Sequence, residues 1–138
     1  MKAVRFAGYA AVFDRTDRGG DVVRRGAFSR AVAAGGDRVP LLWQHRSGEP
    51  IGRIERITED ARGLRVIARL SPQSAAGREA AALLKDGAVG GLSFGYRVRD
   101  AKAGAIRELT DLDLIEISLV TFPMQPLARV HAVDEREG

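Results

Sequence analysis

The chain has 138 residues, of which 45% are hydrophobic and 29% are charged, values typical of one soluble globular domain. Cysteine is absent, which excludes disulfides, thiolate catalysis and cysteine-based zinc or iron–sulfur sites. No apolar run approaches the roughly 20 residues that span a bilayer, and the first residues lack the apolar core of a signal peptide. We therefore expect a soluble domain of the cytosolic type.

Basic residues outnumber acidic residues by 22 to 18, which gives a formal net charge of +4. Nucleic-acid-binding domains usually concentrate their basic residues in a patch or tract. Here basic and acidic residues alternate along most of the chain, and Arg24–Arg25 is the one adjacent basic pair. The charge pattern therefore disfavours a dedicated nucleic-acid-binding role.

The first third of the chain predicts two strands and one short helix. Aromatic and β-branched residues predict a strand over residues 3–13, and polar residues predict a loop over 14–25. A helix is expected over 26–34, ended by the Gly35-Gly36 pair. The apolar run 41–45 predicts a short buried strand.

The middle of the chain predicts a hairpin with arms over residues 50–58 and 63–70. Gly63 at the end of its turn is able to take a positive φ. The isoleucines of the first arm do not alternate strictly with polar residues, which indicates a bulge in that arm.

The last half of the chain predicts one longer helix and two strands. The helix is expected to start at Ser71-Pro72 and to end at Asp86-Gly87. Period-two alternation predicts a strand over 92–98, and the most apolar segment of the chain, 112–120, predicts a central strand. The elements together predict a mainly β (α+β) fold, most simply a small antiparallel β-barrel, with one domain over 1–131 and a charged tail over 132–138.

His45 is one of two histidines. It ends the apolar run 41–45, and strand parity would place it on the same face as Leu41 and Trp43. Such a histidine is either a solvent-facing residue at a strand end or a general base, because imidazole titrates near neutral pH.

Ser93 has glycines at 91 and 95 as its same-face neighbours, so its hydroxyl is expected in a slot that a substrate backbone could enter. The alternative is a glycine-rich strand packed closely against another element. The Gly-x-Ser-x-Gly spacing also matches the nucleophile elbow of α/β-hydrolases, but residues 96–99 continue the strand where the elbow requires a helix.

Glu116 is a lone carboxylate in the apolar segment 112–120, where burial is costly without a partner. It either forms an ion pair with an arginine or accepts the N–H of a neutral histidine, the orienting role in a catalytic triad. His131 is a second and weaker candidate for that orienting role.

Metal and cofactor motifs are not found in the sequence. Asp14, Asp17 and Asp21 are interrupted by arginines and miss the spacing of a calcium loop, so we interpret them as turn residues. No phosphate-binding loop or dinucleotide fingerprint is present. We expect neither a metal nor a cofactor.

Taken together, the motifs resemble the phage prohead protease family, serine peptidases that mature capsids and are structurally related to herpesvirus assemblin. The resemblance spans about residues 6–130. The segments that carry it are Gly8–Asp14, Gly20–Val23, Gly26–Phe28, Pro40–His45, Ile51-Gly52, Gly63-Leu64, Gly91–Tyr96 and Glu116–Val120 with Pro123 following. The resemblance implies an assemblin-like β-barrel.

By this resemblance His45 matches the catalytic histidine, Ser93 the nucleophile, and Glu116 the third triad position, where related viral enzymes carry a second histidine. The implied function is a serine endopeptidase that cleaves scaffold or capsid-precursor segments inside the immature capsid of a phage or gene transfer agent, in the bacterial cytoplasm. Relatives form dimers or larger species, and the helix predicted after Ser71 could serve such contacts. The alternatives are a non-catalytic assembly or scaffold-binding module with the same fold, and a different type of hydrolase that uses the same Ser/His pair.

Overall fold

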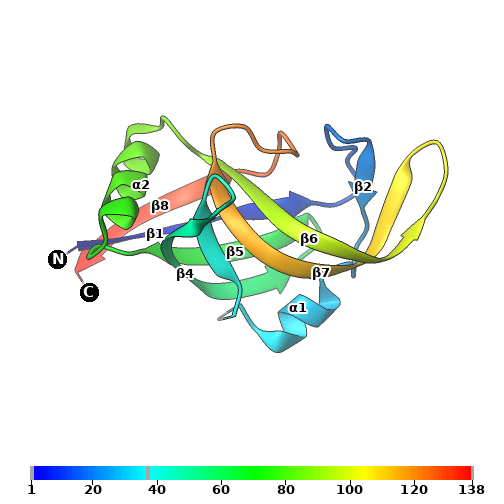
Figure 1. Ribbon diagram of the computed structural model, residues 1–138, viewed down its shortest axis with the longest axis horizontal. Coiled ribbons are helices and arrows are strands. Elements are labelled where there is room, and N and C mark those ends of the chain that lie inside the picture. Colours follow the sequence, from blue (N-terminus) through cyan, green and yellow to red (C-terminus); the bar gives the residue numbers. More distant parts are fainter. Residues whose placement is uncertain (1, 37, 138) are drawn as a thin grey trace.

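The computed structural model describes residues 2–36 and 38–137, which form eight strands and two helices (Figure 1). In chain order these elements are β1 (Lys2–Val12), β2 (Asp21–Val23), α1 (Ser29–Ala34), β3 (Pro40–Trp43), β4 (Arg46–Glu59), β5 (Gly63–Leu70), α2 (Ala75–Asp86), β6 (Gly91–Lys102), β7 (Arg107–Val120) and β8 (Val130–Glu137). The longest described helix, α2, has 12 residues, and no helix within the described ranges is long and apolar enough to cross a membrane.

All eight strands belong to one sheet, with the order β2-β7-β3-β4-β5-β1-β8 and with β6 on the other edge of β7. The long strand β7 pairs antiparallel with β6 along most of its length, and Figure 1 shows the two strands curving side by side. On its opposite edge it pairs in parallel with two short strands, β2 near its start and β3 near its end. The central position predicted for residues 112–120 is confirmed.

The prediction of a mainly β fold with a few helices is confirmed, but the sheet does not close into the small antiparallel barrel that the sequence suggested. The sheet is mixed, because β2 and β3 pair with β7 in parallel while the other strand pairs are antiparallel. It is also not closed. A single bridge between Gly91 and Arg129 joins the start of β6 to the segment before β8, and no continuous ladder follows it.

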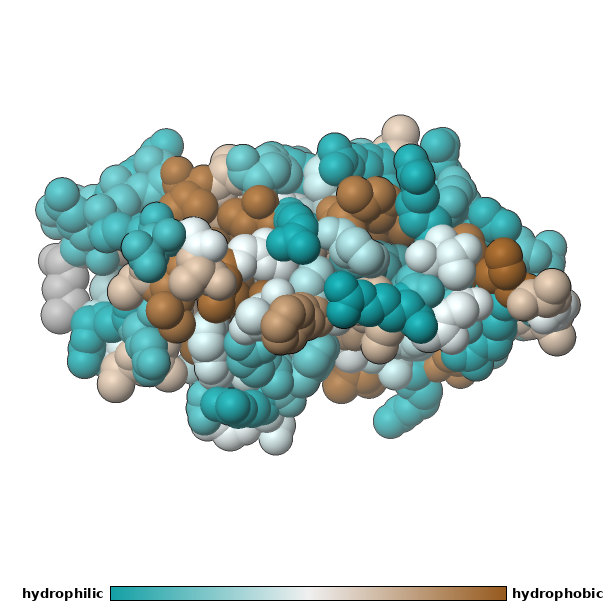
Figure 2. Space-filling model, turned by 90° about the horizontal axis from the view of Figure 1, so that it is seen from above, coloured by the Kyte–Doolittle hydropathy of each residue, from teal (hydrophilic) through white to brown (hydrophobic). Residues whose placement is uncertain are grey.

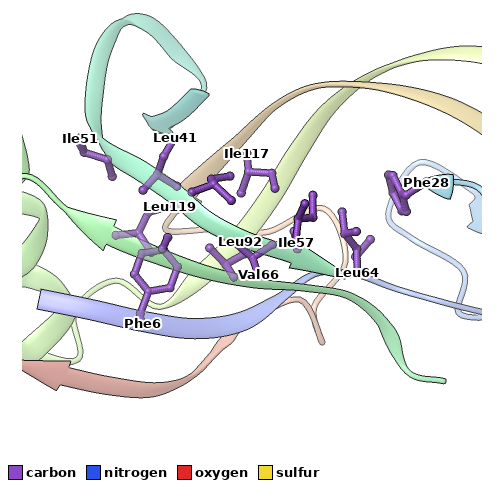
Figure 3. Close-up of a cluster of buried hydrophobic side chains, with 14 of the residues drawn as sticks. Phe6, Phe28, Leu41, Ile51, Ile57, Leu64, Val66, Leu92, Ile117 and Leu119 are labelled. Atoms are coloured by element: carbon purple, nitrogen blue, oxygen red, sulfur yellow. The ribbon is translucent and has the colours of Figure 1, made fainter. Parts of the chain in front are cut away.

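The core is formed by the buried side chains on one face of the sheet. On β5, the buried residues alternate with partly exposed ones, as a strand with one covered face requires. Figure 3 shows the resulting cluster, in which Phe6 of β1, Val66 of β5, Leu92 of β6 and Leu119 of β7 converge. Each such side chain contributes about 1.5–3 kcal/mol on burial. The cluster therefore fixes the positions of β1, β5, β6 and β7 relative to one another. The face seen in Figure 2 is by contrast largely polar, with apolar side chains in separate patches.

Both helices start later than the sequence predicts. Gly26 has φ +88°, which an α-helix does not accommodate, so α1 begins only at Ser29. The Ser71 amide donates to the carbonyl of Ile51 at 2.8 Å, which keeps the chain extended beyond β5. Helix α2 therefore begins after Ser74, whose hydroxyl caps it by accepting from the Gly77 amide at 3.0 Å. Its predicted end is confirmed by the left-handed Gly87.

The hairpin of β4 and β5 confirms the predicted bulge, because the register shifts between Ile54 and Arg56. Gly63 does not use the positive φ that a glycine allows. Glycine is required there for a different reason, since a Cβ at Gly63 would lie 1.9 Å from the carbonyl oxygen of Ala11 on β1.

The two ends of the described chain lie side by side (Figure 1). Strand β8 pairs with β1 from Val130 opposite Gly8 to Glu137 opposite Lys2. It therefore includes most of the segment 132–138 that the sequence analysis set apart as a charged tail. Strand β2 is a further element that the sequence analysis missed, because it is three residues long and lies within an otherwise polar loop.

Candidate active site

The ladder between β6 and β7 places three polar residues on one face of the sheet. Ser93 lies directly opposite Ser118, and Gly95 lies directly opposite Glu116. Because side chains alternate along a strand, Ser93, Ser118 and Glu116 project from the same face. The intervening residues, such as Leu92 and Ile117, project into the core.

His45 reaches this face through a sharp turn at the end of β3. The prediction that it continues the strand face of Leu41 and Trp43 is wrong, because β3 ends at Trp43 and both Gln44 and His45 adopt left-handed backbone angles, with φ of 52° and 61°. Two consecutive non-glycine residues in this region cost about 1–3 kcal/mol each. The turn directs the His45 side chain toward β7.

Hydrogen bonds to β7 and the residue after it hold this turn. The Gln44 amide donates to the carbonyl of Leu119 at 3.0 Å. Its side chain forms two bonds with Thr121, donating from Nε2 to Oγ1 at 2.7 Å and accepting at Oε1 from the backbone amide at 3.1 Å. The His45 amide donates to Ser118 Oγ at 3.0 Å. These bonds offset the conformational cost of the left-handed pair.

Glu116 pairs with His45 rather than with an arginine. Nδ1 of His45 is hydrogen-bonded to Oε1 of Glu116, and Oε2 of Glu116 accepts from Ser118 Oγ at 2.6 Å. The Glu116 side chain is 11% exposed, whereas that of His45 is 44% exposed. When the carboxylate is ionised, the neutral imidazole carries its proton on Nδ1, and the lone pair of Nε2 is available to accept a proton.

Ser93 is 6% exposed, and within the described residues its hydroxyl forms no hydrogen bond. The flanking glycines do not leave an empty slot, contrary to the sequence-based expectation. A Cβ at Gly91 would lie 2.7 Å from Cδ of Pro123, and a Cβ at Gly95 would lie 2.7 Å from Oε1 of Glu116. The glycines thus allow Pro123 and the Glu116 carboxylate to approach the strand on either side of Ser93.

The segment 121–129, which carries Pro123, is hydrogen-bonded to the end of β1. Gln125 is buried, accepts from the Val12 amide at 2.7 Å through Oε1, and donates to the Val12 carbonyl at 3.2 Å through Nε2. Its side-chain amide thus takes the place of a peptide group in a neighbouring strand. The same segment exposes Phe122, Met124 and Leu127 to solvent.

His131 lies elsewhere. It is on β8, and its ring packs against Tyr9 with a centroid separation of 5.8 Å. The structure brings His45 and Glu116 into contact on the face that carries Ser93, and it places His131 beside β1 instead.

Sequence reasoning missed Ser118, Gln44 and Thr121. The signal for Ser118 was present, because it lies two residues after Glu116 in a predicted strand and so shares its face. No comparable signal exists for the Gln44–Thr121 pair, which depends on the left-handed turn.

The aspartates of the 14–21 segment act as turn and ion-pair residues. Asp17 Oδ1 accepts from the amides of Gly19 and Asp21. Asp21 accepts from Arg107 at 2.9 and 2.8 Å, one bond to each carboxylate oxygen. The Arg107 guanidinium holds the pKa of Asp21 below its ordinary value. Within residues 2–36 and 38–137, no cluster of histidine and acidic residues could hold a metal ion.

Comparison with known proteins identifies the family. Residues 1–137 match the sequence model of the caudovirus prohead serine proteases. The chain belongs to this family. It is 33% identical over 138 residues to the prohead protease of Enterobacteria phage HK97, a match that covers 96% of this chain and 61% of that protein. It is also 30% identical over 105 residues to the capsid polyprotein of Pseudomonas phage PAJU2, covering 69% of this chain and 16% of the polyprotein. The chain thus spans about three-fifths of the HK97 protein.

Solved structures confirm the assemblin-like fold. The KSHV protease in complex with a hexapeptide phosphonate inhibitor superposes with a TM-score of 0.66 at 11% identity, covering 99% of this chain and 66% of that one. The varicella-zoster virus protease gives a TM-score of 0.55 at 14% identity, covering 96% and 64%. The fold is therefore shared with herpesvirus proteases. The resemblance to the prohead protease family is confirmed separately by the sequence comparisons.

Proposed function

We propose that this chain is a serine endopeptidase that cleaves scaffolding or capsid-precursor segments inside the immature capsid of a phage or gene transfer agent. Membership of the prohead serine protease family supports the reaction class. One relative is named a prohead protease and another a capsid polyprotein, which supports a capsid precursor as the substrate. The observation that carries the proposal is the hydrogen bond from His45 Nδ1 to buried Glu116, on the sheet face that also carries Ser93.

In the proposed first step, Ser93 Oγ attacks the carbonyl carbon of the scissile peptide while Nε2 of His45 takes the hydroxyl proton. The resulting imidazolium is stabilised by Glu116, which keeps the Nδ1 proton. Collapse of the tetrahedral intermediate breaks the C–N bond, and Nε2 returns the proton to the leaving amine. A water then hydrolyses the acyl-enzyme by the same proton transfers in reverse, which restores Ser93.

The negative oxygen of the tetrahedral intermediate needs hydrogen-bond donors, each worth about 10²–10³ in rate. In our proposal the donors are backbone amides of the segment 121–129, which packs against Gly91 through Pro123. The amides of Thr121 and Ala128 already donate to Gln44 and to Gln125. The proposed donors therefore lie between these two residues.

The experiment that tests the proposal is co-expression with the capsid-precursor and scaffold genes of the same genome, analysed by intact mass. Ser93→Ala is expected to abolish the discrete truncation products, a loss of at least about 10³-fold in cleavage. Ser29→Ala, which removes an exposed serine of α1, is the matched control and is expected to cleave normally. Uncleaved precursor with the wild-type protein, inside shells that have assembled, would refute the peptidase and favour a non-catalytic assembly module.

We further propose that the active species is a homodimer or a larger oligomer. It forms inside the prohead, which itself lies in the host cytoplasm. Helix α2 directs Ala80 and Leu84 into its own domain and leaves its opposite side available for contacts. The specific activity of purified protein is then expected to fall on dilution. Specific activity that is constant over a hundredfold dilution would contradict this part of the proposal while leaving the peptidase intact.

A further inference from the structure

Ser118 occupies the centre of the hydrogen bonds around His45 and Glu116. It is completely buried, and its hydroxyl both accepts from the His45 backbone amide at 3.0 Å and donates to Oε2 of Glu116 at 2.6 Å. The hydrogen bonds form a closed ring, which runs from the His45 backbone amide through Ser118 and the Glu116 carboxylate to Nδ1 of the same histidine. Ser118 is not a member of the proposed triad.

Hydrogen-bond chemistry determines the direction of the two bonds at Ser118. A backbone amide can only donate, so Ser118 Oγ must accept from His45 and has a single proton left to give. That proton is directed at Oε2 of Glu116, which therefore accepts. An ionised Glu116 also accepts at Oε1, and the bond to His45 then carries its proton on Nδ1.

The same hydroxyl also stabilises the unusual backbone at His45. Residues 44 and 45 are both left-handed, a conformation that non-glycine residues keep only when surrounding contacts impose it. The bond from the His45 amide to Ser118 is such a contact, and it joins the turn directly to β7. One side chain thus influences both the backbone position of His45 and the protonation of its ring.

We propose that Ser118 is a positioning residue, which holds His45 in its left-handed turn and keeps its imidazole in the tautomer with the proton on Nδ1. This inference rests on the proposed function, since the tautomer matters for cleavage only if Nε2 is the base that takes the Ser93 proton. Ser118 does not contact the substrate in this proposal. It acts through Glu116 and through the His45 backbone.

The test compares Ser118→Thr with Ser118→Val, because the two side chains have nearly the same shape and differ in the hydroxyl. Cleavage is measured on a peptide that spans the site identified by co-expression, with Ser118→Ala as a third variant that adds no volume. We expect the valine and alanine variants to lose about 10- to 100-fold in kcat with little change in KM, and the threonine variant to regain most of the loss. Equal kcat in threonine and valine variants would overturn the inference.

A second readout does not depend on activity. The protein has only two histidines, so nitrogen NMR of the imidazole rings resolves His45 with His131 as the internal reference. The wild-type His45 ring is expected to carry its neutral-state proton on Nδ1, and Ser118→Val is expected to give a mixture of tautomers while His131 is unchanged. An unchanged His45 tautomer in a folded Ser118→Val protein would refute the positioning role, even if cleavage had fallen through lost stability.

The two measurements also separate this inference from the proposed function. If the wild-type protein cleaves no capsid precursor, the peptidase proposal fails, and the NMR comparison alone decides whether Ser118 positions His45. If the wild type cleaves and Ser118→Val keeps both its kcat and its tautomer, the positioning role fails and the peptidase proposal stands.

Discussion

Strand β7 pairs in parallel with a short strand at each of its ends, and the two junctions differ in their chemistry. At its start, three residues of β2 pair with Arg107–Leu109, and at its end three residues of β3 pair with Ile117–Leu119. Each junction brings a carboxylate to a nitrogen group, Asp21 to Arg107 in the first and Glu116 to His45 in the second.

The two junctions differ in whether the paired nitrogen group keeps a nitrogen that can accept a proton. Arg107 gives two donors to Asp21, and a guanidinium has no lone pair and stays charged at any relevant pH. The β2 junction is therefore a structural ion pair. His45 uses only Nδ1, so its ring keeps one nitrogen for proton transfer, and its backbone is held in a costly conformation. Similar topology thus gives a structural ion pair at the β2 junction and, at the β3 junction, the histidine that we propose as the general base.

Converting the carboxylate of the β3 junction to an amide should have the largest effect on activity. Glu116→Gln can direct its NH₂ group at Nδ1, which favours the wrong tautomer of His45, and we expect kcat to fall about 10³- to 10⁴-fold. The matched control is Asp21→Asn, the same change at the β2 junction, which should leave kcat per folded molecule unchanged. A comparable fall in kcat for both variants would show that the two junctions do not differ in function.

Crowding the same carboxylate should have a smaller effect. Gly95→Ala places a methyl group 2.7 Å from the unshifted Oε1 of Glu116, so the oxygen that contacts His45 must shift from its position. We expect about a 10- to 100-fold loss of kcat in steady-state assays, because misplacement of a catalytic contact by about an ångström has an effect of this order. Gly48→Ala is the control, since nothing lies within 4 Å of its added Cβ, and it should behave as wild type.

The β2 junction should instead show its effect in stability. Asp21→Asn removes the charge from a carboxylate that is 13% exposed and bound by two donors of Arg107. We expect the free energy of unfolding in urea at pH 7 to fall by about 1–2 kcal/mol. An unchanged midpoint and slope would show that this ion pair contributes nothing to stability.

The smallest predicted effect is the pH dependence of the stability difference between the wild type and Asp21→Asn. The pKa of Asp21 is lowered in the folded protein by Arg107, so its contribution to stability is present above the ordinary aspartate pKa and is lost as pH falls through the folded-state pKa. The difference in unfolding free energy between wild type and Asp21→Asn should therefore be constant from pH 7 to about pH 5 and shrink toward pH 2–3. A difference that grows on acidification would contradict the assignment.

The sequence was informative where a local pattern determines structure. Alternating apolar residues correctly predicted β5 and β6, and the high apolar content of residues 112–120 correctly predicted the central part of β7. The two glycines around Ser93 left an open slot and close packing as alternatives, and the structure shows close packing. The residues that occupy those neighbouring spaces, Pro123 and Glu116, could not be inferred, because they depend on the register between β6 and β7. Register is a long-range property that a single strand does not encode.

The turn at His45 is the clearest case that lay beyond local patterns. Gln44 and His45 follow a strand without a glycine or proline, so nothing in the sequence marks a reversal there. Their left-handed backbone is imposed by partners about 75 residues away, Ser118 and Thr121. The parallel pairings of β2 and β3 with β7 were missed for the same reason, since each involves only three residue pairs.

The buried amide of Gln125 has a consequence for the dynamics of the site. Because it completes the hydrogen bonding of Val12 as a strand would, the segment 121–129 cannot lift from Gly91 without exposing both backbone groups of a residue in the sheet. Opening of this segment must therefore break both hydrogen bonds between Gln125 and Val12, and we expect it to be rarer than the fraying of a free loop. Hydrogen exchange at the Val12 amide reports this opening directly, at a residue remote from the chemistry.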